Sequence, residues 1–263
     1  MYRSIEVELD AASGIATATL NRPQAMNGIT QSMLDDFVQL WHWALVEDAV
    51  YVIVLRGHER SRAFTSGADT RGGDNGTDGI ARQSNVFANQ SVHAQLGPRM
   101  HHMYKPVICA VHGICAGTGL FLVNESDIVV CSDDAQFFDP HLSIGIASAS
   151  GPIGMSRRVS LGEVLRFTLL SNAERLSAQA ALRIGLVTEV TTRDELWTRA
   201  DALARVIAAY DTLAVQGTLK AVWESLDPGR RAGLERASLY CDVARGASVK
   251  PFQAAAKQPF TVR

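Results

Sequence analysis

The chain has 263 residues, of which 47% are hydrophobic and 20% charged, and its formal net charge is −2. This length suits one large α/β domain, or one domain with a small appendage, and it allows a sizeable core. The charge gives no general attraction to nucleic acid or to an anionic membrane, so an anionic ligand needs a local basic site.

Several other classes of protein are also disfavoured. The N-terminal segment MYRSIEVELD alternates charged and apolar residues and lacks the apolar centre of a signal peptide. The sequence has no run of about 18 apolar residues, so we expect no membrane span. The four cysteines form no C-x-x-C pair, which favours free thiols in a reducing cytoplasm, and the histidines lack the spacing of a metal site.

The first part of the chain predicts a hairpin, a helix and a buried strand. Residues 5–9 and 15–20 alternate apolar and polar side chains on either side of a short turn, which indicates a β-hairpin. A polar loop then leads to Thr30, which suits the N-cap of a helix that extends to about Val46. The apolar run YVIVL at 51–55 is typical of a buried strand.

A polar region follows this strand. A loop over 56–69 contains the dipeptide Ser66-Gly67, and TRGGDNGTDG at 70–79 is the most glycine-rich and least apolar stretch of the chain. Two interpretations fit that stretch equally well, a mobile surface segment beside a site and a plain disordered loop. A helix is expected over roughly 80–103.

The stretch from Lys105 to Cys131 is the one around which the remaining pattern is organised. Residues 107–111 form a short apolar run with β-branched side chains, as expected for a strand that is covered on both faces. Glycines at 113, 117 and 119 mark a turn in which the backbone comes close to another group, and an apolar helix follows. Unpaired N–H groups at the helix start suit an anion or a polarised oxygen. A tight connection that simply requires glycine explains the same pattern.

The last part of the chain becomes entirely helical. Residues 175–190 combine a helix, with Ser177 as its N-cap and Gly185 at its end, with a final strand. Only helical patterns follow from there. We therefore expect a core over 1–194 and a C-terminal helical region over 195–263, which packs outside the core or against another subunit.

Five segments of the chain carry a family pattern, in the family's order. They are LNRPQAMNGI at 20–29, SRAFTSGAD at 61–69, KPVICAVHGICAGTG at 105–119, SDIVV at 126–130 and AQFFDPHLSIGI at 135–146. Together they resemble the enoyl-CoA hydratase/isomerase family, the crotonase superfamily. The resemblance implies an α/β fold, a right-handed spiral of strand-strand-helix units whose C-terminal helical region makes trimers, often paired into hexamers. It also implies an acyl-CoA substrate and no cofactor beyond the coenzyme A of that substrate.

The same resemblance implies an oxyanion hole made of two backbone N–H groups, which stabilises the enolate of the thioester. By position they belong to Ser66, before the Gly-Ala-Asp triplet, and to Thr118, in the glycine turn. Fixed amide donors in a dry pocket stabilise developing negative charge without reorganising, and one donor contributes about 2.7–4 kcal/mol.

Coenzyme A recognition in the family uses backbone near the first donor, here Ala68, and basic side chains at the mouth of the pocket. The resemblance makes Arg22 and Lys257 candidates for the phosphates. Arg71 is a further candidate, but an ordinary surface charge explains it better.

The sequence departs from the family at both catalytic glutamates of the hydratases, because Phe121 and His141 occupy those positions. Phenylalanine cannot exchange a proton, so hydration by two carboxylates is not expected. Asp139 lies two residues before His141 in an extended segment and would project to the same face, where it could orient the ring and raise its basicity. The alternative is a histidine hydrogen-bonded near a corner, with Asp139 as a turn residue.

Other polar residues near these positions are weaker candidates. Glu125 lies one helical turn beyond Phe121 and would face either the same side or solvent. Ser143, Ser148 and Ser150 suit the positioning of water or substrate.

The leading hypothesis from the sequence is a cytoplasmic acyl-CoA enzyme with the Ser66 and Thr118 amides as its oxyanion hole. His141, oriented by Asp139, would act as the single acid/base in an isomerisation, a thioester hydrolysis or a carbon–carbon cleavage. The alternative is a homologue that binds acyl-CoA without turning it over.

Overall fold

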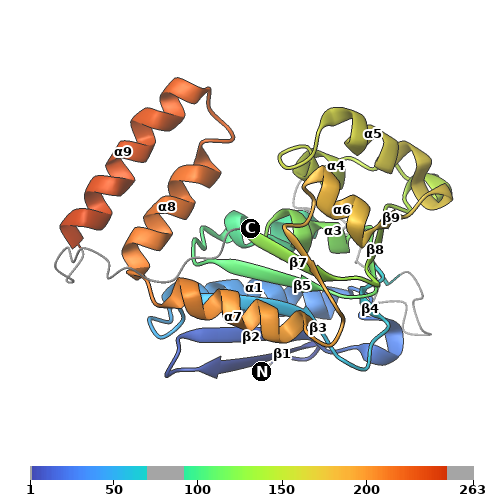
Figure 1. The fold of residues 1–263 in the computed structure, drawn as a ribbon, viewed down its shortest axis with the longest axis horizontal. Coiled ribbons are helices and arrows are strands. Elements are labelled where there is room, and N and C mark those ends of the chain that lie inside the picture. The colour runs from blue at the N-terminus through green and yellow to red at the C-terminus, as the bar shows by residue number, and fades with distance from the viewer. Residues whose placement is uncertain (1, 70–91, 248–263) are drawn as a thin grey trace. The chain divides into compact units, whose positions relative to one another are not determined.

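The computed structural model describes residues 2–69 and 92–247, which form two compact units, Met1–Ala208 and Ala209–Arg263. Figure 1 labels the elements. The strands are β1 Ile5–Asp10, β2 Ile15–Leu20, β3 Val52–Gly57, β4 Ala63–Thr65, β5 Val107–Val111, β6 Ile114–Ala116, β7 Ile128–Ser132, β8 Gln136–Phe138, β9 Leu176–Ser177 and β10 Glu189–Thr191. The α-helices are α1 Gln31–Val46, α2 Val92–Leu96, α3 Gly119–Asn124, α4 Ser150–Met155, α5 Leu161–Leu170, α6 Ala178–Ile184, α7 Leu196–Ala208, α8 Thr212–Glu224 and α9 Arg230–Ala247. Short 3₁₀ turns are η1 Pro23–Ala25, η3 Pro98–His101, η4 Leu142–Ile144 and η5 Ser171–Ala173.

The strands form two sheets that the chain visits in alternation. The larger sheet has the order β1-β2-β3-β5-β7-β10, and the smaller one has the order β4-β6-β8-β9. β3 is followed by β4, β5 by β6 and β7 by β8, so each circuit of the chain places one strand in each sheet, and α3 and α4 follow the second and third circuits. This confirms the predicted α/β fold of strand-strand-helix units, and the first two strands form the predicted antiparallel hairpin.

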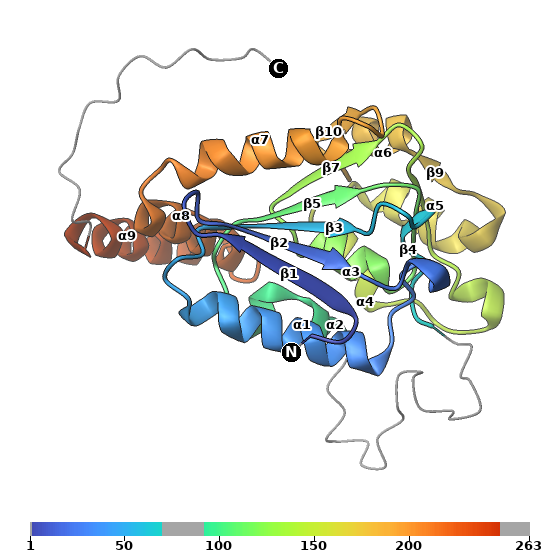
Figure 2. The same ribbon diagram turned by 90° about the horizontal axis from the view of Figure 1, so that it is seen from below.

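Helices cover both faces of the larger sheet. Leu55 of β3 belongs to the core that includes Trp41 of α1, whereas its neighbour Val54 packs in a second cluster with Ala200 of α7. Figure 2 shows the strands between these two helices. A parallel strand with both faces buried has no solvent-facing positions, which explains why β3 and β5 read as continuous apolar runs.

The helix ends follow the local signals of the sequence in most places. The Thr30 side chain accepts a hydrogen bond from the Met33 amide, so it caps α1 as predicted. Ser177 caps α6 in the same way, and Gly185 ends that helix with a left-handed backbone. The helix expected over 80–103 lies partly outside the described residues. In the described part, α2 gives way to a 3₁₀ turn that begins at Pro98, because proline cannot continue the hydrogen bonding of α2.

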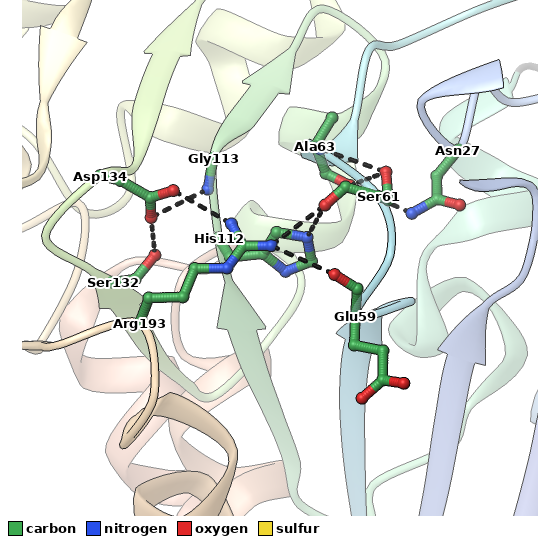
Figure 3. Close-up of polar contacts among 9 residues, drawn as sticks. All are labelled: Asn27, Glu59, Ser61, Ala63, His112, Gly113, Ser132, Asp134 and Arg193. Carbon is green, nitrogen blue, oxygen red and sulfur yellow. Dashed lines mark hydrogen bonds and ion pairs between the residues drawn. The ribbon is translucent and has the colours of Figure 1, made fainter. Parts of the chain in front are cut away.

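A polar network around the buried His112 fastens the segment before α7 to the sheet (Figure 3). His112, which directly follows β5, is fully buried, and its Nε2 lies 3.1 Å from the Ser61 carbonyl oxygen. Arg193 donates to the same carbonyl oxygen and to the Asp134 carboxylate, both at 3.0 Å. Burial, and then the nearby Arg193 charge, lower the pKa of His112 to about 4, so this ring is neutral at neutral pH.

In the second unit, α8 and α9 pack against each other. Gly217 permits the close approach, since a Cβ there would lie 3.3 Å from the Tyr240 carbonyl oxygen. Helix α7 belongs to the first unit, so the contacts divide the chain after Ala208, whereas the sequence analysis places the division after residue 194. The extent of the predicted C-terminal oligomerisation region stays a prediction.

Two further findings concern the described residues only. None of their helices is both long enough and apolar enough to cross a bilayer. They also contain no group of three His, Cys, Asp or Glu side chains that could hold a metal ion.

Candidate active site

Two loops from different sheet circuits meet closely because glycines remove the side chains that would separate them. A Cβ on Gly67, after β4, would lie 2.7 Å from the Ala116 carbonyl oxygen and 3.4 Å from the Thr118 nitrogen. A Cβ on Gly119 would lie 2.3 Å from Cγ2 of Thr65. The loop after β4 is therefore in direct backbone contact with the turn before α3, which explains the glycine pattern of the sequence.

A third segment, the corner after β8, reaches the same turn. Gly117 has φ +49, and a Cβ there would lie 3.3 Å from Pro140 Cδ and 3.6 Å from Cε1 of His141. The Gly117 amide also donates to the Phe138 carbonyl oxygen at 3.0 Å. The imidazole of His141 therefore lies beside the turn that carries Thr118.

Two N–H groups at this meeting point, those of Ala68 and Thr118, donate to no acceptor among the described residues. Ala68 pairs with Ile29 in a short parallel bridge, in which Ile29 donates to Gly67 at 2.8 Å and Asp69 donates to Ile29 at 2.9 Å. Successive amides of an extended segment point to opposite sides, so the Ala68 amide points away from Ile29. Both groups are thus candidate donors to a ligand.

The Ser66 amide, expected to be the first oxyanion donor, is already bonded within the protein. It donates to the Met26 carbonyl oxygen at 3.0 Å. Between Ser66 and Ala68, Gly67 adopts φ +87 and turns the chain, so the two amides face different partners. The structure therefore moves the candidate donor from Ser66 to Ala68, which the sequence analysis assigned to coenzyme A binding.

Asn27 holds the loops around these amides, a role that the sequence analysis missed. Met26 and Asn27 both have left-handed backbone, with φ of 50° and 52°. The buried Asn27 side chain donates to the carbonyl oxygens of Ala63 and Phe64 at 3.1 and 3.0 Å, and its Oδ1 accepts from the Arg22 amide at 3.0 Å. The backbone carbonyl oxygen of Asn27 accepts from Thr65 Oγ1 at 2.7 Å. The available signal was an asparagine in a polar loop, since asparagine tolerates left-handed backbone better than most residues.

His141 and Asp139 form the hydrogen-bonded pair that the sequence suggests. Nδ1 of His141 contacts Oδ1 of Asp139, and the His141 backbone N–H donates to the same oxygen at 3.1 Å. A carboxylate only accepts, so Nδ1 carries the proton. The Asp139 side chain is 2% exposed and the His141 side chain 28%, so the carboxylate is buried while part of the ring remains accessible.

The two groups shift each other's proton affinity. The hydrogen bond to Asp139 raises the pKa of His141, and it outweighs partial burial, which acts in the opposite direction. Burial would raise the pKa of Asp139, but the hydrogen bonds from His141 and Ser148 outweigh it and hold that pKa below its ordinary value. Asp139 is therefore ionised at neutral pH, and Nε2 of His141 is the nitrogen left for acid/base work.

The first turn of α3 supplies apolar surface instead of a carboxylate. Phe121 packs on the core, and a Cβ on Gly151 of α4 would lie 3.7 Å from its Cε1. Glu125 lies one turn further, where burial raises its pKa and the charges of Arg99 and Arg158 oppose that rise. Glu125 is thus part of a charge cluster, and it stays an unassigned candidate.

Of the basic residues expected to bind coenzyme A, only Arg22 lies among the described residues. The Arg22 guanidinium donates to the Gly28 carbonyl oxygen and to the Asp69 carboxylate, the latter at 3.1 Å, and its side chain is 22% exposed. These contacts fasten the loop before α1 to the segment that carries Ala68. Arg71 and Lys257 lie outside the described residues.

Two amides without an acceptor among the described residues, beside an imidazole–carboxylate pair, can stabilise a negatively charged oxygen while a proton is moved. Comparison with known proteins identifies the family of the chain. A family model described as enoyl-CoA hydratase/isomerase matches residues 10–241. The chain is 30% identical to 2,3-dehydroadipyl-CoA hydratase of Escherichia coli (strain K12) over 82% of its own length and 81% of the relative. It is 28% identical to the short-chain-enoyl-CoA hydratase of Clostridium acetobutylicum over 82% and 80% of the two chains.

Solved structures give the same result. The crystal structure of an enoyl-CoA hydratase/isomerase from Mycobacterium paratuberculosis superimposes with a TM-score of 0.81 and 33% identity, over 92% of this chain and 90% of the other. The chain belongs to the enoyl-CoA hydratase/isomerase family.

Proposed function

We propose that this protein is an acyl-CoA enzyme that holds a thioester enolate with the N–H groups of Ala68 and Thr118 and moves a proton with His141. The observation that supports it best is the meeting of two open amides, from separate segments, beside an accessible imidazole. The relatives named above act on coenzyme A thioesters by name, which supports that class of substrate.

In this scheme His141 acts as the base. Nε2 removes a proton from the carbon next to the thioester carbonyl, and the electron pair of that C–H bond moves into the carbonyl group, which becomes an enolate. The two amides donate to the enolate oxygen, each contributing about 2.7–4 kcal/mol. Asp139 fixes the ring tautomer and stabilises the imidazolium that forms.

A single base limits the reactions that follow. Because Phe121 cannot activate water, the imidazolium of His141 is the proton donor for the second step. Returning the proton to a different carbon gives an isomerisation. Cleavage of a carbon–carbon or thioester bond fits a different first step, in which neutral His141 removes a proton from water instead of from carbon. The hydroxide attacks a carbonyl carbon, and the imidazolium then gives the proton to the carbon or sulfur that leaves.

A second candidate function is binding of acyl-CoA without turnover, and Phe121 is the observation that favours it. Loss of one proton-transfer group is expected in a homologue that has lost catalysis. The His141–Asp139 pair, with its buried carboxylate, favours the enzyme, since a protein that only binds has no need of a raised histidine pKa.

The two functions are separated by assaying turnover and binding together. Enoyl-, 3-oxoacyl- and cyclic acyl-CoA esters are tested with the wild type, with His141→Ala and with His42→Ala, a control in which an exposed histidine on α1 is removed. We expect His141→Ala to lose turnover by roughly 10²–10⁴-fold, with acyl-CoA binding retained, while the control stays at wild-type activity. Equal inertness of wild type and His141→Ala, with binding intact in both, would support the non-catalytic protein.

Other parts of the scheme are proposals without a described site. Lys257 and Arg22 are proposed to bind the coenzyme A phosphates. Arg22 would do so by replacing its ion pair with Asp69 by a contact with a phosphate. A trimer or hexamer and a cytoplasmic location are expected from the family and from the free cysteines.

A further inference from the structure

The carboxylate of Asp139 is held by a residue that the reaction scheme above does not use. Oγ of Ser148 donates to Oδ2 of Asp139, while Oδ1 accepts from Nδ1 and from the backbone N–H of His141. The Asp139 side chain is 2% exposed, so water does not compete freely for either oxygen. One carboxylate oxygen therefore serves the base, and the other is bonded to Ser148.

Ser148 lies in a surface loop, yet its side chain is turned inward. The loop leads from η4 to α4, and within residues 142–150 every residue except Ser148 is exposed. The hydroxyl thus anchors the loop to the buried carboxylate. A serine that positioned water or substrate would present its hydroxyl to the open site instead.

We propose that Ser148 is a positioning residue, which keeps the Asp139 carboxylate aimed at His141 and tunes how tightly the imidazole holds its proton. The proposal rests on the proposed role of His141 as the base. Ser148 does not touch the substrate in this scheme, and it acts only through Asp139.

The direction of the effect depends on two opposing consequences of losing the hydroxyl. A freer carboxylate could turn away from the ring, which would lower the pKa of His141. A carboxylate with one donor fewer also carries more unscreened charge and holds the imidazolium more strongly, which would raise that pKa. Without the Ser148 hydroxyl, Asp139 keeps two other hydrogen bonds. Its Oδ1 accepts from the His141 backbone N–H, and its backbone carbonyl oxygen accepts from Ser171 Oγ at 2.8 Å. The charge effect therefore decides the sign.

Within the residues that the structure describes, few other charges lie near the pair. The segments around it are the 116–119 turn, the 142–150 loop, η5 and α4, and none of these carries a charged side chain. The guanidinium of Arg175, the residue before β9, lies over the Phe138 ring of β8, 4.3 Å from the ring centroid, and donates to the Gln136 side chain. The pKa of His141 thus reports mainly on Asp139.

The test is an NMR titration of the His141 ring in the full-length protein without substrate, with the signal assigned from its loss in His141→Ala. Ser148→Ala should raise the titration midpoint of His141 by roughly half a pH unit. Ser148→Thr, which keeps a hydroxyl, should return it to the wild-type value. Ser150→Ala, the same change at the exposed first residue of α4, directly after this loop, should leave the His141 midpoint unchanged.

Three results would overturn the proposal: an unchanged or lower midpoint in Ser148→Ala, an equal shift in Ser150→Ala, or no recovery in Ser148→Thr. Because the titration needs no turnover, a catalytically inert wild type would refute the proposed function and leave this test intact. If the wild type does turn over acyl-CoA, the acid limb of its kcat/KM profile should move upward with the NMR midpoint in Ser148→Ala.

Discussion

Gly119→Ala tests whether the close contact between the two loops of the site requires the absence of a side chain at Gly119. The new Cβ would lie 2.3 Å from Cγ2 of Thr65, where ordinary contact begins at 3.4 Å, so about 1 Å of movement is needed. Thr65 cannot rotate away without loss, because its Oγ1 donates to the Asn27 carbonyl oxygen at 2.7 Å and accepts from the Gly67 amide at 3.2 Å. The backbone at Gly119 is not left-handed, so alanine itself is not strained there.

The expected magnitude follows from opposing terms. Overpacking of a buried contact costs typically about 1–3 kcal/mol. Replacing glycine at the start of α3 by alanine returns at most about 1 kcal/mol through helix propensity. The free energy of unfolding should therefore fall by roughly 1–2 kcal/mol, and turnover should fall as well, because the turn that carries the Thr118 amide is displaced.

Thr65→Ser provides the matching rescue, because it removes Cγ2 and keeps the hydroxyl. Urea denaturation of the two single variants and the double variant gives a coupling energy, which we expect to be about 1–2 kcal/mol in favour of the double variant. Gly162→Ala is the control, since nothing lies within 4 Å of a Cβ at that position of α5. Additive effects, or a Gly119→Ala variant as stable as the control, would refute the proposed packing of the loops.

Three further predictions concern single side chains. The pKa of the buried His112 is lowered from 6.5 to about 4, so its contribution to the free energy of unfolding should be complete above pH 6.5 and should fall by up to about 3 kcal/mol towards pH 4. Urea denaturation of His112→Phe should show a weaker dependence of this free energy on pH than the wild type. Asn27→Ala should cost about 2–4 kcal/mol in the same assay, through three lost side-chain hydrogen bonds and a strained backbone, whereas Asn172→Ala, at an exposed position, should cost under about 0.5 kcal/mol. Asp139→Asn should lower the NMR-titrated pKa of His141, and an unchanged value would mean that the pair is not coupled.

The overall architecture was largely predictable because its signals are local or spread over many residues. The continuous apolar runs of β3 and β5 required cover on both faces, and the structure provides it. The caps at Thr30 and Ser177 depend only on residues within one turn. The ordered family segments then implied a spiral of strand-strand-helix units, which no single element could show.

The site was harder to predict because it depends on the direction of individual backbone groups. Choosing Ala68 over Ser66 required knowing that Gly67 turns the chain between them, because the Ser66 amide is bonded to Met26 and the Ala68 amide has no acceptor among the described residues. The hydrogen bond from Ser148 to Asp139 starts in an exposed loop that has no periodic pattern, so the sequence of the loop does not predict this bond. By contrast, Asp139 and His141 are close in sequence and do pair, but not through the extended segment that the sequence analysis expected. β8 ends at Phe138, His141 has helical backbone, and Oδ1 of Asp139 accepts from both its backbone N–H and its ring, as in a turn.

The central claim is that the amides of Ala68 and Thr118 converge on one thioester oxygen. The most direct measurement is the infrared stretching frequency of a ¹³C-labelled thioester carbonyl in an acyl-CoA bound to the protein. The account predicts a lower frequency than in water, and a partial return in Thr118→Pro, which removes one N–H at a residue whose φ of −56° suits proline. A bound thioester whose carbonyl frequency equals that in water, in both proteins, would contradict it.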